Sequence, residues 1–335
     1  MEGIENIRNN LLSLREEDFI PAALTVFRYQ YENNELYRSY IDALGKDVYQ
    51  INQVEDIPFL PISFFKQHEV KTGTWQEEKV FESSRTTGTI PSRHYVRDLA
   101  FYHNVSEAIF ESMYGPLSGY HILALLPGYL ERDSSSLVYM AKYFMEKSGS
   151  DYSGFYLDDF DSLTDTINEL TDNPDKLGGR RVLLMGVTFA LLDLSSVYKR
   201  SVKDVMIMET GGMKGRRKEM VRKEVHAELK QSFGVGGVHS EYGMTELLSQ
   251  AYALEDGRFR TSPWMKLFIR DINDPFCIDN SLRSGGVNIV DLANIDSCAF
   301  IETQDVGRYH PEGGVEVLGR MDNTDVRGCN LLLIR

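Results

Sequence analysis

Short apolar runs that alternate with longer amphipathic stretches constrain the fold of this chain more than any other feature. HILALLP ends at Pro127 and is followed by SSSLVYMAKYFMEKSG, a helix pattern with serines at its start. RVLLMG and DVMIMETGG repeat the arrangement, and each leads into another stretch with helical periodicity. Strands that alternate with helices are typical of parallel sheets covered by helices on both faces. The sequence therefore predicts the α/β class.

The pattern differs toward the two ends of the chain. Residues 1–80 carry mostly helix signals and form a predicted helical lead-in, which ends where the prolines of IPFLPISFF force an extended segment. Residues 81–257 form the predicted α/β core. Residues 258–335 contain short strand-and-turn segments such as GGVNIVDL, CAFIETQD and GGVEVLGR, so we expect a small β-rich subdomain there.

Composition excludes several classes of partner. The 36 basic and 50 acidic side chains give a net charge of −14, which disfavours attraction to nucleic acid or anionic lipid. The start of the chain lacks a basic stretch followed by an apolar run, and no window approaches the roughly 18 apolar residues of a membrane span. We therefore expect a cytoplasmic protein.

The three cysteines do not suggest a disulfide framework. Cys277, Cys298 and Cys329 are an odd number without paired or metal-like spacing, so at least one should be a free thiol. A free cysteine most often serves as a small buried apolar residue.

The first candidate site motif is the loop SSRTTGTIPS at residues 83–92. Its hydroxyls, including those of Ser84, Thr86 and Thr87, surround Gly88, and such a loop can bind phosphate oxygens through O–H and backbone N–H donors. The lysine of a Walker A loop is missing, which disfavours a P-loop NTPase. A solvated surface loop has the same composition and remains the alternative.

The second motif is YGMTE, which follows the glycine-rich FGVGGVHSE. Tyr242 can stack on adenine, and Gly243 permits close approach of the backbone to a ligand. Thr245 and Glu246, which we expect near a helix start, can serve a phosphate and its Mg²⁺. An ordinary helix cap is the alternative.

The third motif lies in the C-terminal part of the sequence. Asp305 occurs in TQDVGRY, and Arg320 occurs in LGRMDNTDVRGCN. A carboxylate after a strand can accept both hydroxyls of a ribose, and an arginine can close over the ribose or the α-phosphate. Each residue alone could equally be a solvated turn charge.

Together, the ordered motifs carry a family resemblance. The hydroxyl loop, METGG, YGMTE, QDVGR and GRMDNTDVRG resemble the adenylate-forming superfamily of acyl-CoA synthetases, luciferase-type ligases and peptide-synthetase adenylation domains. Within it, IPFLPISFFK, SSRTTGTIPSRH and the terminal RGCN are most similar to the LuxE type, the acyl-protein synthetase of the bacterial luminescence fatty-acid reductase complex. The resemblance runs from about residue 57 to the end. It implies the fold of the superfamily's N-terminal domain.

The resemblance also implies a set of contacts with ATP and Mg²⁺ at these motif positions. The β- and γ-phosphates would contact Ser84, Thr86, Thr87 and Gly88, the adenine pocket would be edged by Gly211 and Gly212, and the base would stack on Tyr242 beside Gly243. Thr245 and Glu246 would serve the α-phosphate and Mg²⁺, and Asp305 and Arg320 the ribose. Cys329 matches the acyl-accepting cysteine of the LuxE type.

The sequence departs from the superfamily pattern at two places. Arg85 stands where the phosphate loop usually has glycine, so we expect its guanidinium to contribute to phosphate binding. Most superfamily members continue into a mobile C-terminal domain with a catalytic lysine, whereas this sequence ends fifteen residues after Arg320. We expect that domain and its lysine to be absent.

The resemblance implies activation of a carboxylic acid, fatty or aryl, as an acyl-adenylate, followed by transfer of the acyl group to Cys329 and delivery to a reductase subunit. If TDVRGCN is extended, Arg327 lies on the same face as Cys329 and favours its thiolate. Aromatic and aliphatic residues suggest an apolar acid pocket at Tyr129, Met185, Val187 and Phe189. Two alternatives stay open: an acyl- or aryl-CoA ligase of the phenylacetate type, and a non-catalytic relative that binds nucleotide or an acyl chain.

Overall fold

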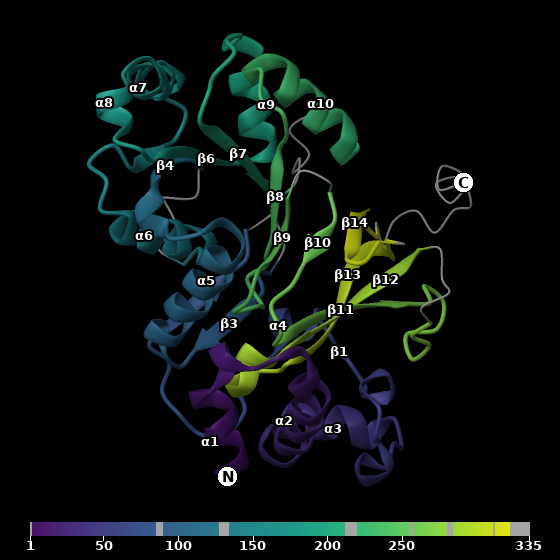
Figure 1. Ribbon diagram of the computed structural model, residues 1–335. Helices are drawn as coiled ribbons and strands as arrows, with labels where there is room; N and C mark the ends of the chain where they lie inside the picture. Colours follow the sequence, from purple (N-terminus) through teal and green to yellow (C-terminus); the bar gives the residue numbers. More distant parts are fainter. Residues whose placement is uncertain are drawn as a thin grey trace.

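The computed structural model (Figure 1) describes residues 2–84, 90–126, 134–211, 220–254, 257–279, 284–310 and 312–321. Within these segments, twelve strands join one sheet in the order β11-β12-β13-β14-β10-β9-β8-β7-β6-β4-β5, with β1 against β13, while β2 and β3 form a hairpin. The strands are β1 (Leu60–Pro61), β2 (Lys79–Glu82), β3 (Arg93–Val96), β4 (Tyr120–Leu125), β5 (Gly154–Tyr156), β6 (Arg181–Val187), β7 (Val205–Thr210), β8 (His239–Tyr242), β9 (Ala251–Ala253), β10 (Phe259–Arg260), β11 (Met265–Arg270), β12 (Gly285–Asp291), β13 (Phe300–Tyr309) and β14 (Val315–Arg320).

Ten α-helices lie in the same described segments, together with short 3₁₀ turns, of which η6 (Leu292–Asp296) matters below. The helices are α1 (Glu2–Asn9), α2 (Phe19–Asn33), α3 (Glu35–Ala43), α4 (Phe64–Gln67), α5 (Leu99–Tyr114), α6 (Ser136–Ser148), α7 (Phe160–Asp172), α8 (Pro174–Leu177), α9 (Thr188–Val197) and α10 (Arg222–Phe233). None of the helices in the described part is long and apolar enough to cross a membrane.

The predicted α/β class is confirmed in one half of the sheet. Strands β5, β4, β6, β7 and β8 run parallel, and helices such as α6 and α9 pack against them. Strands β4 and β7 are buried along their whole length, which explains why they appear in the sequence as continuous apolar runs. Gly186 in β6 lets α9 approach, because a Cβ there would come within 2.9 Å of Leu191.

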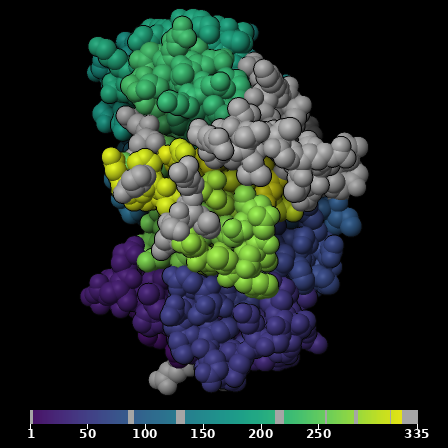
Figure 2. Space-filling view, turned by 90° about the vertical axis from the view of Figure 1, so that its right-hand side faces the viewer, coloured from purple at the N-terminus to yellow at the C-terminus, as the bar shows by residue number. Residues whose placement is uncertain are grey.

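The other half of the sheet is antiparallel and contains the strands β12, β13 and β14 of the C-terminal segment. Strands β8 to β14 pair antiparallel with one another, and a single register pair, Phe259 with Val315, joins β10 to β14. In Figure 2 these yellow and light green strands lie between the α/β half and the N-terminal helices. The junction of the two halves therefore brings the end of β8 close to β13 and β14.

Helices α1 to α4 lie in the N-terminal segment, and α2 and α3 pack on the antiparallel half. Rings of Phe27 and Tyr37 contact Phe300 of β13 at centroid distances of 5.8 and 6.3 Å. Buried Gln30 of α2 binds the turn before β13: its amide donates to the carbonyls of Asn294 and Ile295 at 2.9 and 3.0 Å, and its carbonyl accepts from the N–H of Ala299 at 2.9 Å.

Gln30→Leu should therefore destabilise the protein strongly. The substitution keeps the apolar contacts but leaves buried backbone groups without partners, which we expect to lower the free energy of unfolding by about 3 kcal/mol. Urea denaturation gives the measurement, and Asn33→Leu on the exposed face of the same helix is the matched control. Equal stabilities of the two variants would contradict this role of Gln30.

Candidate active site

The end of β8, the middle of β13 and the end of β14 bring three predicted site residues together. The Tyr242 hydroxyl donates to Asp305 Oδ2 at 2.7 Å, and Arg320 Nε lies 3.6 Å from Asp305 Oδ1. Burial raises the pKa of Asp305, and the hydrogen bond from Tyr242 and the charge of Arg320 partly offset this. A carboxylate has about four lone-pair sites, so Asp305 keeps acceptor capacity for a ligand.

A β-bulge sets the Asp305–Arg320 pair. Asp305 lies directly opposite Arg320, and Val306 opposite Gly319, but the next pair is Gly307 with Val317, so Leu318 is an extra residue. Gly307 is required here, because a Cβ would come within 2.8 Å of Val287 and 2.9 Å of a backbone oxygen of β14. The glycine of QDVGR is thus needed because the packing around the bulge leaves no room for a side chain.

The YGMTE motif corrects one prediction. Thr245 and Glu246 do not lie near a helix start: they form a tight turn, in which the N–H of Leu247 donates to Met244 O at 3.1 Å. The chain continues extended into β9. The N–H groups of Leu248 and Ser249 pair with the carboxylate of Asp291, a long-range partner, before the chain enters β9.

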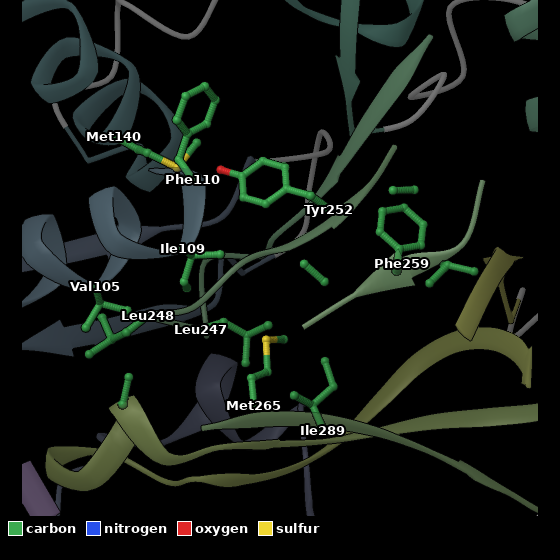
Figure 3. Packing of buried hydrophobic residues seen from close by; sticks show 14 of the residues in the cluster. Val105, Ile109, Phe110, Met140, Leu247, Leu248, Tyr252, Phe259, Met265 and Ile289 are labelled. Carbon is green, nitrogen blue, oxygen red and sulfur yellow. The ribbon is translucent and has the colours of Figure 1, made fainter. Parts of the chain in front are cut away.

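Asp291 holds the residues that follow the turn. Its carboxylate accepts from the N–H of Leu248 at 3.1 Å and from the N–H and hydroxyl of Ser249 at 2.9 and 2.7 Å. Leu247 and Leu248 belong to the buried cluster that also contains Val105 of α5 and Met265 of β11 (Figure 3). Core packing and a buried carboxylate therefore override the local helix signal.

Glu246 is a buried carboxylate at this turn. It is 5% exposed, and its backbone carbonyl accepts from the Asn294 amide at 2.8 Å. Burial raises the pKa of Glu246, whereas a hydrogen bond from Ser92 and the charge of Arg320 lower it. In the described residues no cluster of three His, Cys, Asp or Glu side chains could form a metal cage. A single carboxylate fits Mg²⁺ whose other ligands are phosphates and water.

The hydroxyl loop starts and ends at the β2–β3 hairpin. The N–H of Ser83 donates to Ser92 O at 3.0 Å, and the N–H of Ser92 donates to Ser83 Oγ at 2.9 Å. Ser84 is exposed just beyond this pair. His94, two residues after Ser92, places Nδ1 2.9 Å from Thr245 O, so the base of the loop lies against the YGMTE turn. The predicted phosphate ligands Arg85, Thr86, Thr87 and Gly88 lie outside the described residues.

The METGG motif ends β7 beside the end of β8. Gly211 is exposed and has a φ of +72°, a conformation that favours glycine, and Gly212 lies outside the described residues. Thr210 is opposite Glu241 in the parallel pair, and its hydroxyl donates to the Glu241 carboxyl. Gly243 is exposed and lies next to that carboxyl: a Cβ at this position would come within 2.3 Å of Glu241 Oε1. Gly211, Tyr242 and Gly243 therefore share one edge.

Two buried glutamates at this edge were not predicted from the sequence. Burial would raise the pKa of Glu209, but hydrogen bonds from His226, Ser240 and Thr188 and the charge of Arg222 lower it to about 2. Burial raises the pKa of Glu241 to about 7, and the charge of Glu209 adds to the rise. The hydrogen bond from Thr210 lowers the pKa and offsets only part of it. Glu209 lies in the apolar run DVMIMETGG and Glu241 in the glycine-rich FGVGGVHSE, and neither position signalled these opposite environments.

Arg222 at the start of α10 links the two halves of the sheet. Its Nε donates to Glu209 Oε1 at 3.0 Å, and its Nη1 donates to Val317 O of β14 at 2.6 Å. The guanidinium lies 4.8 Å from the centroid of the Phe259 ring on β10. Arg222 therefore ties METGG to the strand that carries Arg320.

The remaining predicted residues divide into two groups. Cys329 and Tyr129 lie outside the described residues, while Met185, Val187 and Phe189 are buried in β6 and α9, where an acid pocket stays a prediction. Of the other two thiols, Cys277 is exposed and Cys298 is buried. Burial raises the pKa of Cys298 to about 12, which makes it a poor nucleophile.

This fold is that of the adenylate-forming enzymes. O-succinylbenzoate coenzyme A synthetase (MenE) from Bacillus subtilis, solved with ATP and magnesium ion, superposes with a TM-score of 0.52 and 15% identity, covering 76% of this chain and 52% of MenE. Apo MatB from Rhodopseudomonas palustris gives 0.50 and 14%, covering 73% and 48%. The amide bond synthetase McbA from Marinactinospora thermotolerans gives 0.50 and 16%, covering 73% and 49%. This chain thus spans about half the length of these enzymes.

The chain belongs to the LuxE family of acyl-protein synthetases, whose sequence model matches residues 12–335. The resemblance inferred from the motifs is therefore confirmed, and it extends further toward the N-terminus than the motifs indicated. A search of curated proteins found no match.

The two buried glutamates should make the free energy of unfolding depend on pH in opposite directions. Glu241 has its ordinary pKa of 4.5 when unfolded and about 7 when folded, so its contribution is fully present below pH 4.5 and is lost as the pH rises through 7. Between these values the wild type should lose about 3 kcal/mol relative to Glu241→Gln, measured by urea denaturation. If the free energies of unfolding of the wild type and Glu241→Gln changed with pH in parallel, the raised pKa would not belong to Glu241.

Glu209→Gln is the matched control with the opposite sign. The folded pKa of Glu209 is about 2, so its carboxylate stabilises the protein above pH 4.5 and this contribution is lost only as the pH falls through 2. Glu209→Gln should therefore be less stable than the wild type at neutral pH.

Proposed function

We propose that this protein uses ATP to activate a carboxylic acid as an acyl-adenylate and then transfers the acyl group to its own Cys329. The observation that carries the proposal is the convergence of Tyr242, Asp305, Arg320 and Glu246, contributed by strands and turns far apart in the sequence. Membership in the LuxE family and the shared adenylate-forming fold support it.

The nucleotide would bind along the shared edge of β7, β8, β13 and β14. The Tyr242 ring offers a face to adenine beside Gly211, and Asp305 accepts the ribose hydroxyls with the lone pairs that Tyr242 leaves unused. Arg320 is 70% exposed, so its guanidinium can turn toward the α-phosphate without losing a buried partner.

In the first half-reaction a carboxylate oxygen of the acid attacks the α-phosphorus of ATP. The bond from that phosphorus to the bridging oxygen breaks, and pyrophosphate leaves with the electron pair, so the products are acyl-AMP and pyrophosphate. Mg²⁺ held by Glu246 would supply charge neutralisation at the phosphates. Arg320 and the hydroxyl donors of the loop, including Ser84, would stabilise the remaining negative charge.

In the second half-reaction the Cys329 thiolate attacks the acyl carbon. The bond between that carbon and the phosphate oxygen breaks, AMP leaves, and the thiol proton passes to solvent. Arg327, two residues from Cys329, provides a positive charge that favours the thiolate. We propose a long-chain fatty acid as the substrate and an acyl-reductase subunit as the acceptor of the thioester, in line with the resemblance to the LuxE type.

Glu246→Gln tests the first half-reaction. Loss of the metal-binding carboxylate should lower acid-dependent ATP–pyrophosphate exchange by at least about 100-fold, which corresponds to several kcal/mol of charge stabilisation. Glu312→Gln, an exposed glutamate paired with Arg258, is the control. Because burial raises the pKa of Glu246, wild-type exchange should also decline on the acidic side at a pH above the ordinary glutamate range. Unchanged exchange in a folded Glu246→Gln variant would refute the metal role.

Cys329→Ser separates the second half-reaction from the first. Adenylation precedes the thiol step, so exchange should persist, whereas the hydroxylamine-labile acyl adduct should disappear from intact-mass spectra after incubation with ATP, Mg²⁺ and a panel of fatty and aryl acids. Cys277→Ser, which removes an exposed thiol, is the control and should keep the adduct. An adduct that survives in Cys329→Ser would assign another acceptor, and AMP release that depends on added coenzyme A would favour a CoA ligase.

A further inference from the structure

We infer that His94 of the β2–β3 hairpin is a positioning residue that clamps the Thr245–Glu246 turn against the base of the hydroxyl loop. The inference deepens the proposed function and rests on it for the role of Glu246. It names a residue outside the predicted ATP contacts, and it makes the geometry of that residue a condition for adenylation.

The clamp is one buried hydrogen bond to the turn. His94 Nδ1 lies 2.9 Å from Thr245 O. The His94 side chain is buried, and so is Ser92, two residues before it at the base of the hydroxyl loop. The bond fixes the backbone that carries Glu246.

His94 acts as a neutral donor. Thr245 O can only accept, so Nδ1 carries the proton in this contact. Burial lowers the pKa of His94 to about 4, and the Phe65 ring packs edge-on against the imidazole at 6.1 Å. The imidazole therefore stays neutral at neutral pH, which excludes a role as an acid or a cation.

The clamp joins the two parts of the site that must act on the same phosphates. Ser83 and Ser92 close the base of the hydroxyl loop with two hydrogen bonds, and His94, two residues further along, reaches Thr245. From the opposite side, Asn294 holds the Glu246 carbonyl and Asp291 holds the amides of Leu248 and Ser249. The backbone of the turn is thus fixed from both sides, as the support of a metal-binding carboxylate in a preorganised site should be.

A pair of substitutions at His94 isolates the Nδ1 donor. In His94→Asn the side-chain amide nitrogen takes the position of Nδ1, whereas in His94→Gln it takes the position of Nε2, and both variants lose the ring. We expect His94→Gln to lower the kcat of ATP–pyrophosphate exchange about tenfold or more and to raise the Mg²⁺ concentration for half-maximal rate. His94→Asn should stay within about threefold of the wild type. Equal rates for both variants, whether normal or reduced, would overturn the clamp.

Amide hydrogen exchange tests the clamp without any catalytic activity. Residues 244–250 should exchange faster in His94→Gln than in His94→Asn, while the distant helix α7 should be unchanged in both. If the wild type shows no pyrophosphate exchange, the proposed function is refuted, but the difference in amide hydrogen exchange between the two variants still tests the clamp. Identical amide hydrogen exchange in residues 244–250 of both variants would refute the clamp.

Discussion

The buried carboxylate of Asp291 is the constraint on which the site depends. It lies at the end of β12, yet it accepts N–H groups from Leu248 and Ser249, which follow the YGMTE turn at the end of the parallel half. Breaking the hydrogen bonds of a buried carboxylate with this many donors costs much free energy, because the loss of one partner leaves desolvated polar groups behind. The bonds fix the chain between the turn and β9. As a result Thr245 and Glu246 sit at a turn that faces β13 and β14 across the junction of the sheet.

Charge is distributed unevenly around this junction. Glu209 is stabilised as a carboxylate by Arg222 and by hydroxyl donors, whereas Glu241, on the neighbouring strand, has Thr210 as its main donor and a pKa of about 7. Burying Glu241 costs stability at neutral pH, which makes it an exception to the rule that buried charges are paired. Such costs concentrate at functional sites, and this one lies beside the candidate nucleotide edge.

The sequence carried local information well and long-range information poorly. The apolar runs of β4, β6 and β7 and the serine start of α6 are local signals, and each element formed where it was predicted. The helix start predicted at Thr245 was wrong because the deciding partner, Asp291, lies more than forty residues away. The contact between His94 and Thr245 spans 151 residues and has no local signature. Residues such as Asp305 and Arg320 were found only because their order resembled a family. Their roles in catalysis stay predictions.

The two sides of the candidate site differ in rigidity, and this difference has a mechanistic consequence. Glu246 is buried and its carbonyl accepts from Asn294, so its backbone cannot shift without breaking a buried hydrogen bond. Arg320 is largely exposed, and its 3.6 Å contact with Asp305 is the kind of surface ion pair that contributes little stability. The arginine can therefore move while Glu246 stays fixed. The proposed reaction in two half-reactions would use this difference, because the phosphates would have to be aligned while pyrophosphate leaves, and the side that contacts AMP would then have to open to admit a thiol.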